Sequence, residues 1–151
     1  MKKFFSFAAA LLACVLTFTS CEKNIDSPIV GKWNASLVIK TDDGEFSGMR
    51  IFSFYPSGSF HYADYFISSD GVMRDAINAT EGTYKLDGDK VTLHFKNFGT
   101  IKNGEPTWDK DFKPYDELAK WRVEGAYLYL TRNAGTAEEH EEKFHNAFSG
   151  N

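Results

Sequence analysis

The fold class of this chain is decided by Glu81-Gly82-Thr83-Tyr84-Lys85-Leu86-Asp87-Gly88-Asp89-Lys90-Val91-Thr92-Leu93-His94-Phe95. Large apolar side chains alternate with polar ones on both sides of the short polar segment around Gly88. A period of two is typical of a strand with one buried face. Two such runs around a tight glycine turn predict an antiparallel hairpin.

Similar alternating runs follow one another along most of the chain, separated by turn residues such as Pro56-Ser57-Gly58, where Gly58 can take a positive φ. The region from Phe98 to Leu118 carries glycines and prolines, and we expect a long loop there with one edge strand. Eight strand cores are expected, centred on Trp33, Phe46, Phe60, Val72, Tyr84, Val91, Trp121 and Tyr127. Short strands without helical crossovers predict an all-β, eight-stranded antiparallel up-and-down barrel. A two-sheet sandwich is the alternative.

The C-terminal segment from Ala137 to Phe148 has a different pattern. It is rich in Glu and Lys, which favour a helix, and Phe144 and Phe148 lie one helical turn apart. We expect a C-terminal amphipathic helix on the barrel wall. An extended segment from Glu142 to Phe148 is the alternative.

The N-terminus has the layout of a secretory signal. Lys2 and Lys3 precede a run of about 15 mostly apolar residues that ends in small residues before Cys21, too short to span a membrane comfortably. A cysteine at this place resembles the signal of a bacterial lipoprotein, which implies cleavage before Cys21 and acylation of its thiol. The expected organisation is a signal peptide at 1–20, a lipidated flexible tether at 21–28, and a barrel domain with a helical tail at 29–151.

Charge and cysteine content exclude several classes of function. Without Lys2 and Lys3 the chain keeps 15 Lys and Arg against 21 Asp and Glu, a net charge of −6. This balance argues against a nucleic-acid partner, because phosphate binding needs a basic surface. Cys14 would leave with the signal and Cys21 would carry the lipid, so we expect neither a disulfide nor a thiol nucleophile.

Several short motifs resemble one protein family. They are Gly31-Lys32-Trp33, Phe54-Tyr55-Pro56-Ser57-Gly58-Ser59-Phe60, Glu81-Gly82-Thr83-Tyr84 and Trp121-Arg122-Val123-Glu124-Gly125. Their order and spacing over 29–132 resemble the lipocalin-like lipoproteins of Bacteroides-type bacteria, distant members of the lipocalin superfamily. The resemblance implies an eight-stranded barrel, and it implies that Arg132 covers Trp33 and closes one barrel end. It also implies a place in the bacterial envelope, and because Glu22 replaces the Asp that retains many lipoproteins at the inner membrane, we expect the outer membrane.

Motifs for catalysis and metal binding are missing from the sequence. There is no nucleophile elbow, phosphate-binding loop, dinucleotide fingerprint or H-E-x-x-H motif. His140 and His145 are five residues apart, and Asp87-Gly88-Asp89 lacks the remaining ligands of a calcium loop. We expect no enzymatic activity, cofactor or metal.

The remaining prediction concerns the interior of the barrel, which can hold a packed core or one small ligand. The residues expected to line a ligand cavity are Phe52, Phe54, Phe60, Tyr62, Asp64, Tyr84, Leu93, Phe95 and Trp121. If they surround an open cavity, the protein binds a small hydrophobic or amphipathic ligand, which is our first hypothesis. If they meet and fill the barrel, the chain is a structural or protein-interaction lipoprotein, a complex subunit or an inhibitor with an unknown partner.

Overall fold

The computed structural model describes residues 24–147, and the expected signal peptide and Cys21 lie outside this range. Every regular element within it is a strand: β1 (Gly31–Thr41), β2 (Gly44–Phe54), β3 (Ser59–Phe66), β4 (Ala76–Asp87), β5 (Lys90–Lys102), β6 (Glu105–Trp108), β7 (Tyr115–Glu124), β8 (Tyr127–Arg132) and β9 (His140–Asn146). The described residues include no helix that is long and apolar enough to cross a membrane.

Eight of these strands form a closed antiparallel barrel. Neighbours follow the order β1, β2, β3, β4, β5, β7, β8 and β9, and β9 pairs with β1 to complete the circle. The short strand β6 pairs only with the far half of β5. The predicted all-β, eight-stranded barrel is therefore confirmed, and it replaces the sandwich alternative.

The hairpin that decides the fold class is β4–β5. Tyr84 lies opposite Leu93, and Gly82 lies opposite Phe95 beside an irregularity in the register. A Cβ atom on Gly82 would lie 1.9 Å from the carbonyl oxygen of His94, so only glycine allows the two backbones this approach. At the preceding turn Gly58 has a φ of 84°, as predicted.

Seven of the eight predicted strand cores lie in seven different strands, but Val72 lies in none, because β4 begins at Ala76 and runs through Tyr84 without a break. The strands expected around Val72 and around Tyr84 therefore correspond to the single strand β4. The prediction separated them because Glu81-Gly82 reads as a strand start. Gly82 instead lies within the strand, where the missing side chain admits an irregular register.

The predicted C-terminal helix is wrong over the described residues, and the extended alternative is confirmed from Glu142 to Asn146, although the strand begins earlier, at His140. Phe148 lies outside the described residues. Residues 140–146 form β9, in which Phe144 is fully buried and lies opposite Leu128. The helix propensity of the Glu and Lys residues is a few tenths of a kcal/mol each. Pairing with both β8 and β1 outweighs it, because the barrel would otherwise leave two open edges.

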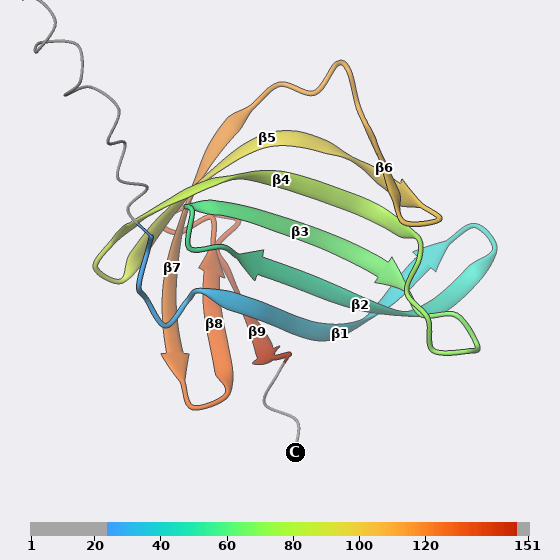
Figure 1. The fold of residues 1–151 in the computed structure, drawn as a ribbon, viewed down its shortest axis with the longest axis horizontal. Helices are drawn as coiled ribbons and strands as arrows, with labels where there is room; N and C mark the ends of the chain where they lie inside the picture. Colours follow the sequence, from blue (N-terminus) through green and yellow to red (C-terminus); the bar gives the residue numbers. More distant parts are fainter. Residues whose placement is uncertain (1–23, 148–151) are drawn as a thin grey trace, which may run out of the picture.

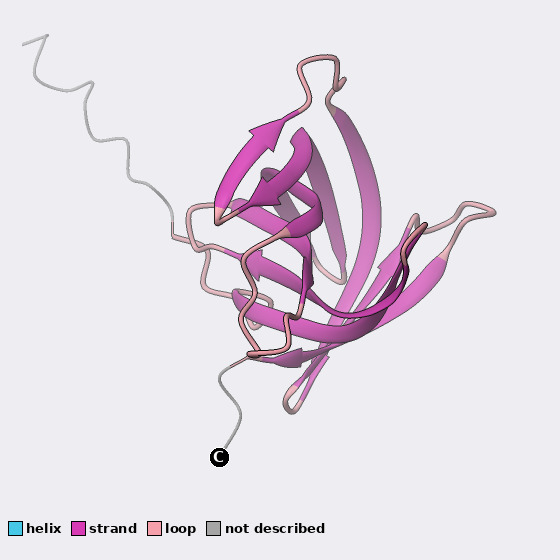
Figure 2. Cartoon of the chain, turned by 90° about the vertical axis from the view of Figure 1, so that its right-hand side faces the viewer, coloured by secondary structure: helices cyan, strands magenta, loops and turns pink. Residues whose placement is uncertain are grey.

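The barrel has two walls that meet at one end and separate at the other. Strands β1–β5 run side by side, and β7–β9 cross them (Figures 1 and 2). β1 pairs with β9 only at Trp33 and Asn34, and β5 pairs with β7 only from Lys90 to Phe95. We call the end with turns 55–58, 88–89 and 125–126 the closed end, and the end with connections 42–43, 67–75, 103–104, 109–114 and 133–139 the wide end.

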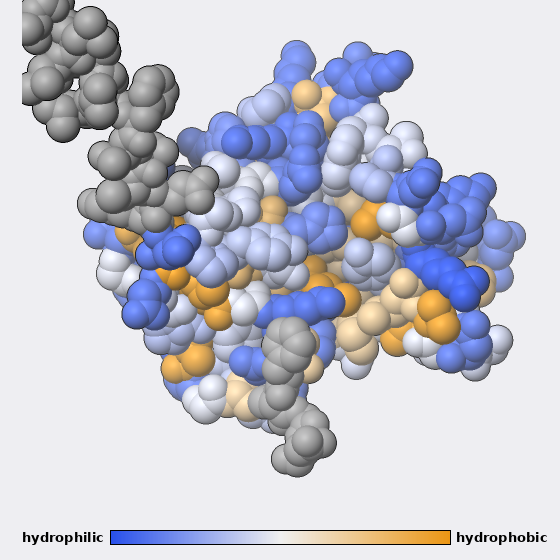
Figure 3. All heavy atoms as spheres, in the orientation of Figure 1, coloured by the Kyte–Doolittle hydropathy of each residue, from blue (hydrophilic) through white to orange (hydrophobic). Residues whose placement is uncertain are grey.

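The main core fills the barrel towards the closed end and draws on all eight barrel strands. Its largest fully buried side chains are Trp33, Phe52, Phe54, Phe60 and Phe144. On the outer face seen in Figure 3, hydrophobic residues form separate patches among hydrophilic ones, as on a water-facing surface.

Candidate functional site

The nine residues predicted to line a cavity are close together, and their rings pack against one another. The ring of Phe52 lies 4.5 Å from that of Phe54 and 5.5 Å from that of Phe60. Tyr84 contacts Phe54 at 5.1 Å, and Phe95 contacts Phe60 at 5.2 Å. Seven of the nine residues are buried, Phe52, Phe54, Phe60, Asp64, Tyr84, Leu93 and Phe95. These side chains form a core instead of an open cavity lining.

Most polar atoms of this core have partners. The Trp33 indole N–H donates to the carbonyl of Ile29 at 2.8 Å, and the Tyr84 hydroxyl donates to the carbonyl of Tyr55 at 2.8 Å. The indole nitrogen of Trp121 is the one buried side-chain polar atom, among the described residues, without a hydrogen-bond partner. A buried donor without an acceptor lowers the stability of the folded protein by about 1–3 kcal/mol.

Above this core, towards the wide end, lies a cluster of five charged side chains that we call the ion network: Arg50, Asp64, Glu117, Arg132 and Glu142. Arg50 donates to both carboxylate oxygens of Asp64, at 2.8 and 3.0 Å. Arg132 bonds to both carboxylate oxygens of Glu117 in the same bidentate manner. Paired geometry of this kind gives charge-assisted hydrogen bonds that are strong and directional.

Glu142 joins the two bidentate pairs. One of its oxygens accepts from Arg50, and the other accepts from Arg132 at 3.4 Å. Arg50 is on β2, whereas Glu142 is on β9. The network therefore connects the two walls at a level where their backbones no longer pair.

Hydrogen bonds and nearby charges keep the two arginines of the network protonated. The carboxylates of Asp64 and Glu117 are almost completely buried. The hydrogen bond to Asp64 is the largest cause that raises the pKa of Arg50 above its ordinary value. Burial lowers the pKa of Arg132, but the bond to Glu117 and the charges of Glu117 and Glu142 outweigh it and raise that pKa overall. Both guanidinium groups stay cationic, so the network has two positive charges against three carboxyl groups.

Aromatic rings flank the guanidinium groups. The Arg50 guanidinium lies 5.2 Å from the centre of the Tyr62 ring, and that of Arg132 lies 5.8 Å from the rings of both Tyr62 and Phe95. Burial, followed by the charge of Asp64, raises the pKa of the Tyr62 hydroxyl. Asp64 also accepts from the Asn78 amide at 3.3 Å. Tyr62 and Asp64, which we predicted as polar groups in a ligand cavity, thus belong to the contacts of the network.

The structure places Arg132 and Trp33 at different ends of the barrel, contrary to the predicted closure. Trp33 lies opposite Asn146 on β9, whereas Arg132 lies opposite His140, six residues away. At about 3.3 Å per residue this is about 20 Å. The prediction took β8 as the last strand. Because β9 is the last strand, its C-terminal end lies beside Trp33, and Arg132 is at the wide end with the network.

Sequence reasoning did not identify Arg50, Glu117 and Glu142. Each lies two positions from a buried apolar residue of the same strand and therefore faces inward with it, as Glu117 does with Ala119. A charged residue in phase with the apolar face of a strand is the signal that could have identified them.

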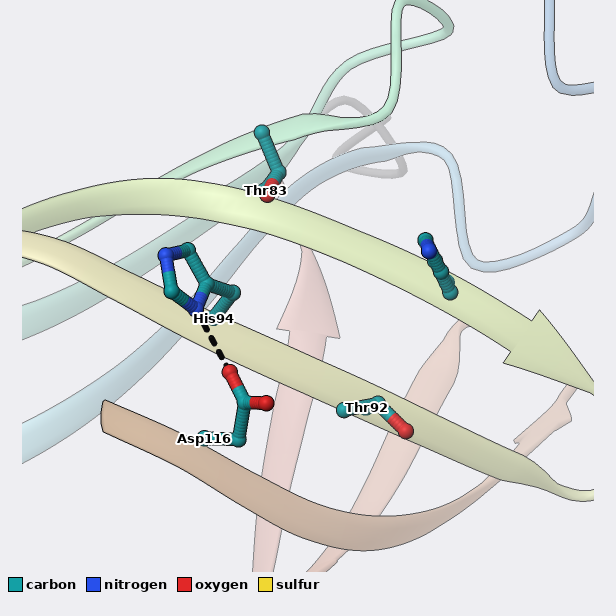
Figure 4. Close-up of a pocket in the computed structure, with 5 residues that line it drawn as sticks. Thr83, Thr92, His94 and Asp116 are labelled. Atoms are coloured by element: carbon teal, nitrogen blue, oxygen red, sulfur yellow. Dashed lines mark hydrogen bonds and ion pairs between the residues drawn. The ribbon is translucent and has the colours of Figure 1, made fainter. Parts of the chain in front are cut away.

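A separate hollow of about 300 Å³ lies on the outer wall, lined by Thr83, Lys85, Thr92, His94 and Asp116 (Figure 4). His94 Nδ1 and Asp116 Oδ1 are 2.5 Å apart. Among the described residues, no hydroxyl or thiol hydrogen-bonds to the other nitrogen of His94. Residues 24–147 contain no group of three or more His, Cys, Asp or Glu side chains that could hold a metal ion.

No family model matches this sequence, and no curated protein is similar enough to be matched.

Proposed function

We propose that this chain is a lipid-anchored, lipocalin-like envelope lipoprotein of Bacteroides-type bacteria whose barrel binds a protein partner. The observation that carries the proposal is the filled barrel: eight of the nine predicted lining residues pack in or against the main core, and the ninth, Asp64, belongs to the ion network above it. A barrel occupied by its own side chains is a rigid scaffold, and such scaffolds present loops and rims for recognition.

The wide end is the best-supported contact surface. Within residues 24–147, nine large hydrophobic side chains are exposed, and six of them lie there: Val38, Phe46, Val72, Met73, Phe98 and Tyr115. Exposed apolar and aromatic side chains gathered at one end are typical of binding surfaces, because aromatic residues contribute most of the energy at interface centres.

A second candidate is a small hydrophobic or amphipathic ligand held at the wide end. Phe46 lies on the same face of β2 as the buried Phe52 and contacts Phe66 at 5.9 Å. Tyr115 stacks on Phe95 at 4.8 Å and also contacts Phe112. These partly exposed rings lie near the network and would suit a molecule with an apolar body and a polar group.

Native mass spectrometry of the lipidated protein, purified from its own envelope, tests the two candidates. We expect a co-purifying protein that is lost when Phe46 and Phe98 are both changed to Ser. The matched control is Tyr55→Ser at the closed end, where a ring of similar exposure is removed. A co-purifying small molecule would support the second candidate instead, and a partner lost equally from all variants would contradict the wide-end surface.

The proposed anchor has a separate test. Cells fed labelled palmitate are expected to label the wild-type chain and not Cys21→Ala. Persistent labelling of the variant would rule out Cys21 as the lipid attachment site.

A further inference from the structure

The chain enters the barrel at the closed end. The backbone N–H of Ile25 donates to the carbonyl of Pro56 at 2.7 Å, and the Ile25 side chain packs against the main core. The turn at Ser27 is closed by a 3.0 Å bond from Val30. The tether was expected to extend to Pro28, but its contacts with the barrel begin at Ile25.

This early contact leaves little chain between the barrel and Cys21. Only three residues lie between Cys21 and Ile25, and the four Cα–Cα steps between the two reach at most about 14 Å when fully extended. By comparison, β1 alone has 11 residues and is about 33 Å long. A lipid on Cys21 would therefore hold the closed end close to the membrane surface, while the wide end lies about one strand length away.

The two ends of the barrel also differ in charge. The closed-end segments 24–32, 54–59, 85–90, 123–128 and 143–147 contain four Lys and four Asp or Glu residues, so their net charge is zero. The wide-end segments 40–45, 67–75, 102–114 and 133–139 contain five Lys or Arg and ten Asp or Glu residues, a net charge of −5. An anionic membrane surface repels the wide end within a Debye length, about 8–10 Å, and leaves the closed end unaffected.

Two exposed tyrosines add to this difference. Tyr55 and Tyr127, both at the closed end, are 47% and 39% exposed. Tyrosine favours the headgroup layer of a bilayer, because its ring is apolar and its hydroxyl is polar. The Lys143 ammonium lies 4.0 Å from the Tyr127 ring and places a cation at the same level.

We propose that the closed end rests on the lipid headgroups and that the wide end, with its exposed rings and ion network, points away from the membrane. This inference rests on the proposed lipid anchor at Cys21. In this orientation one end of the barrel contacts the membrane, and the other end is accessible to a soluble partner.

Site-directed labelling tests the orientation. Residues 22–151 contain no cysteine, so one introduced cysteine is the only free thiol of the lipidated chain. A fluorophore attached to Asp89→Cys reports on the closed-end turn, and one attached to Asp43→Cys reports on the wide-end turn. Both positions are exposed aspartates, and the two changes are therefore matched. Each lipidated variant is reconstituted in phosphatidylcholine–phosphatidylglycerol vesicles that contain a headgroup-attached quencher.

We expect quenching at position 89 to be several-fold stronger than at position 43. Equal quenching at both positions, or stronger quenching at position 43, in chains that float with the vesicles would overturn the orientation and leave the anchor intact. Failure to float, together with no palmitate incorporation, would overturn the anchor and the orientation with it. Labelled chains that also carry Cys14→Ser and Cys21→Ala provide the background, because the uncleaved chain would otherwise keep Cys14 as a second thiol.

Discussion

Glu142 lies between two guanidinium groups, with one carboxylate oxygen bonded to Arg50 and the other to Arg132. Its side chain is 14% exposed, and that of Arg132 is 13% exposed. Charges this deeply buried are stable only when they are paired, because water no longer solvates them. At the scale of residues, the wide half of the barrel depends on this one bridge.

Glu142→Gln is expected to lower the free energy of unfolding by about 2 kcal/mol, because Arg50 and Arg132 each lose a charge-assisted hydrogen bond but keep their bidentate partners Asp64 and Glu117. Glu141→Gln, at the next position on β9, is the control. Glu141 faces solvent and pairs with the exposed Arg122, so its loss should cost less than about 1 kcal/mol. Urea unfolding measures both values, and equal losses would mean that the network does not connect the walls.

His61 is expected to make stability depend on pH. Burial is the largest effect on its pKa and lowers it below the ordinary value of 6.5, and the charge of Glu81 opposes this only in part. The unfolded chain therefore takes up a proton at a higher pH than the folded chain does. Stability from His61 is present above pH 6.5 and is lost as the pH falls below it.

Urea unfolding between about pH 7.5 and 5 checks this prediction. The free energy of unfolding of the wild type should fall as the pH falls. That of His61→Gln should fall less steeply. Identical slopes in the two proteins would show that another group causes the loss.

Among the strands, β9 has the largest structural effect for its length. Six of its seven residues, 140–145, pair with β8, and its last two residues pair with Trp33 and Asn34 of β1, which closes the barrel. Phe144, Glu142 and Asn146 face inward, whereas Lys143 and His145 face outward. Pairing with strands on both sides fixes which side chains of β9 face the interior. The helix propensity of its residues therefore has little influence on its structure.

Phe144→Ala is expected to cost about 3–5 kcal/mol of unfolding free energy, because it leaves a cavity in the main core. Lys143→Ala removes an outward side chain from the same strand and should cost about 1 kcal/mol or less. Thermal and urea unfolding of the two variants give the comparison. A small effect of Phe144→Ala would mean that β9 is not part of the barrel wall.

The whole molecule has one large core at the closed end and a smaller cluster at the wide end. The smaller cluster contains Ala63, Ala76, Ala79 and Ile101, with Tyr65 and Trp108 beside it. Few large side chains are buried there, and β6 pairs with one neighbour only. Stability should therefore decrease from the closed end to the wide end.

Amide hydrogen exchange measures this gradient. We expect the slowest exchange in the closed-end half of β4 and β5, around Tyr84 and Leu93, and much faster exchange in β6. Uniform protection along β5 would contradict the gradient and would indicate that the wide end is as stable as the core.

Seven of the eight barrel strands and the composition of the main core follow from the sequence alone. Period-two alternation, turn glycines and the absence of helical crossovers predicted an eight-stranded barrel, and the buried rings of Phe52, Phe54 and Phe60 follow from the same alternation. Alternation is a local property, because it depends only on which side of a strand each side chain takes.

Only the tertiary structure decided which strand closes the barrel, what occupies its interior, and where Arg132 lies. Each of these depends on pairing between distant segments, such as β1 with β9, and on whether inward side chains meet or leave space. Helix propensity in residues 137–148 was a local signal that two long-range pairings outweighed. The ion network likewise exists because five different strands bring its five charges together.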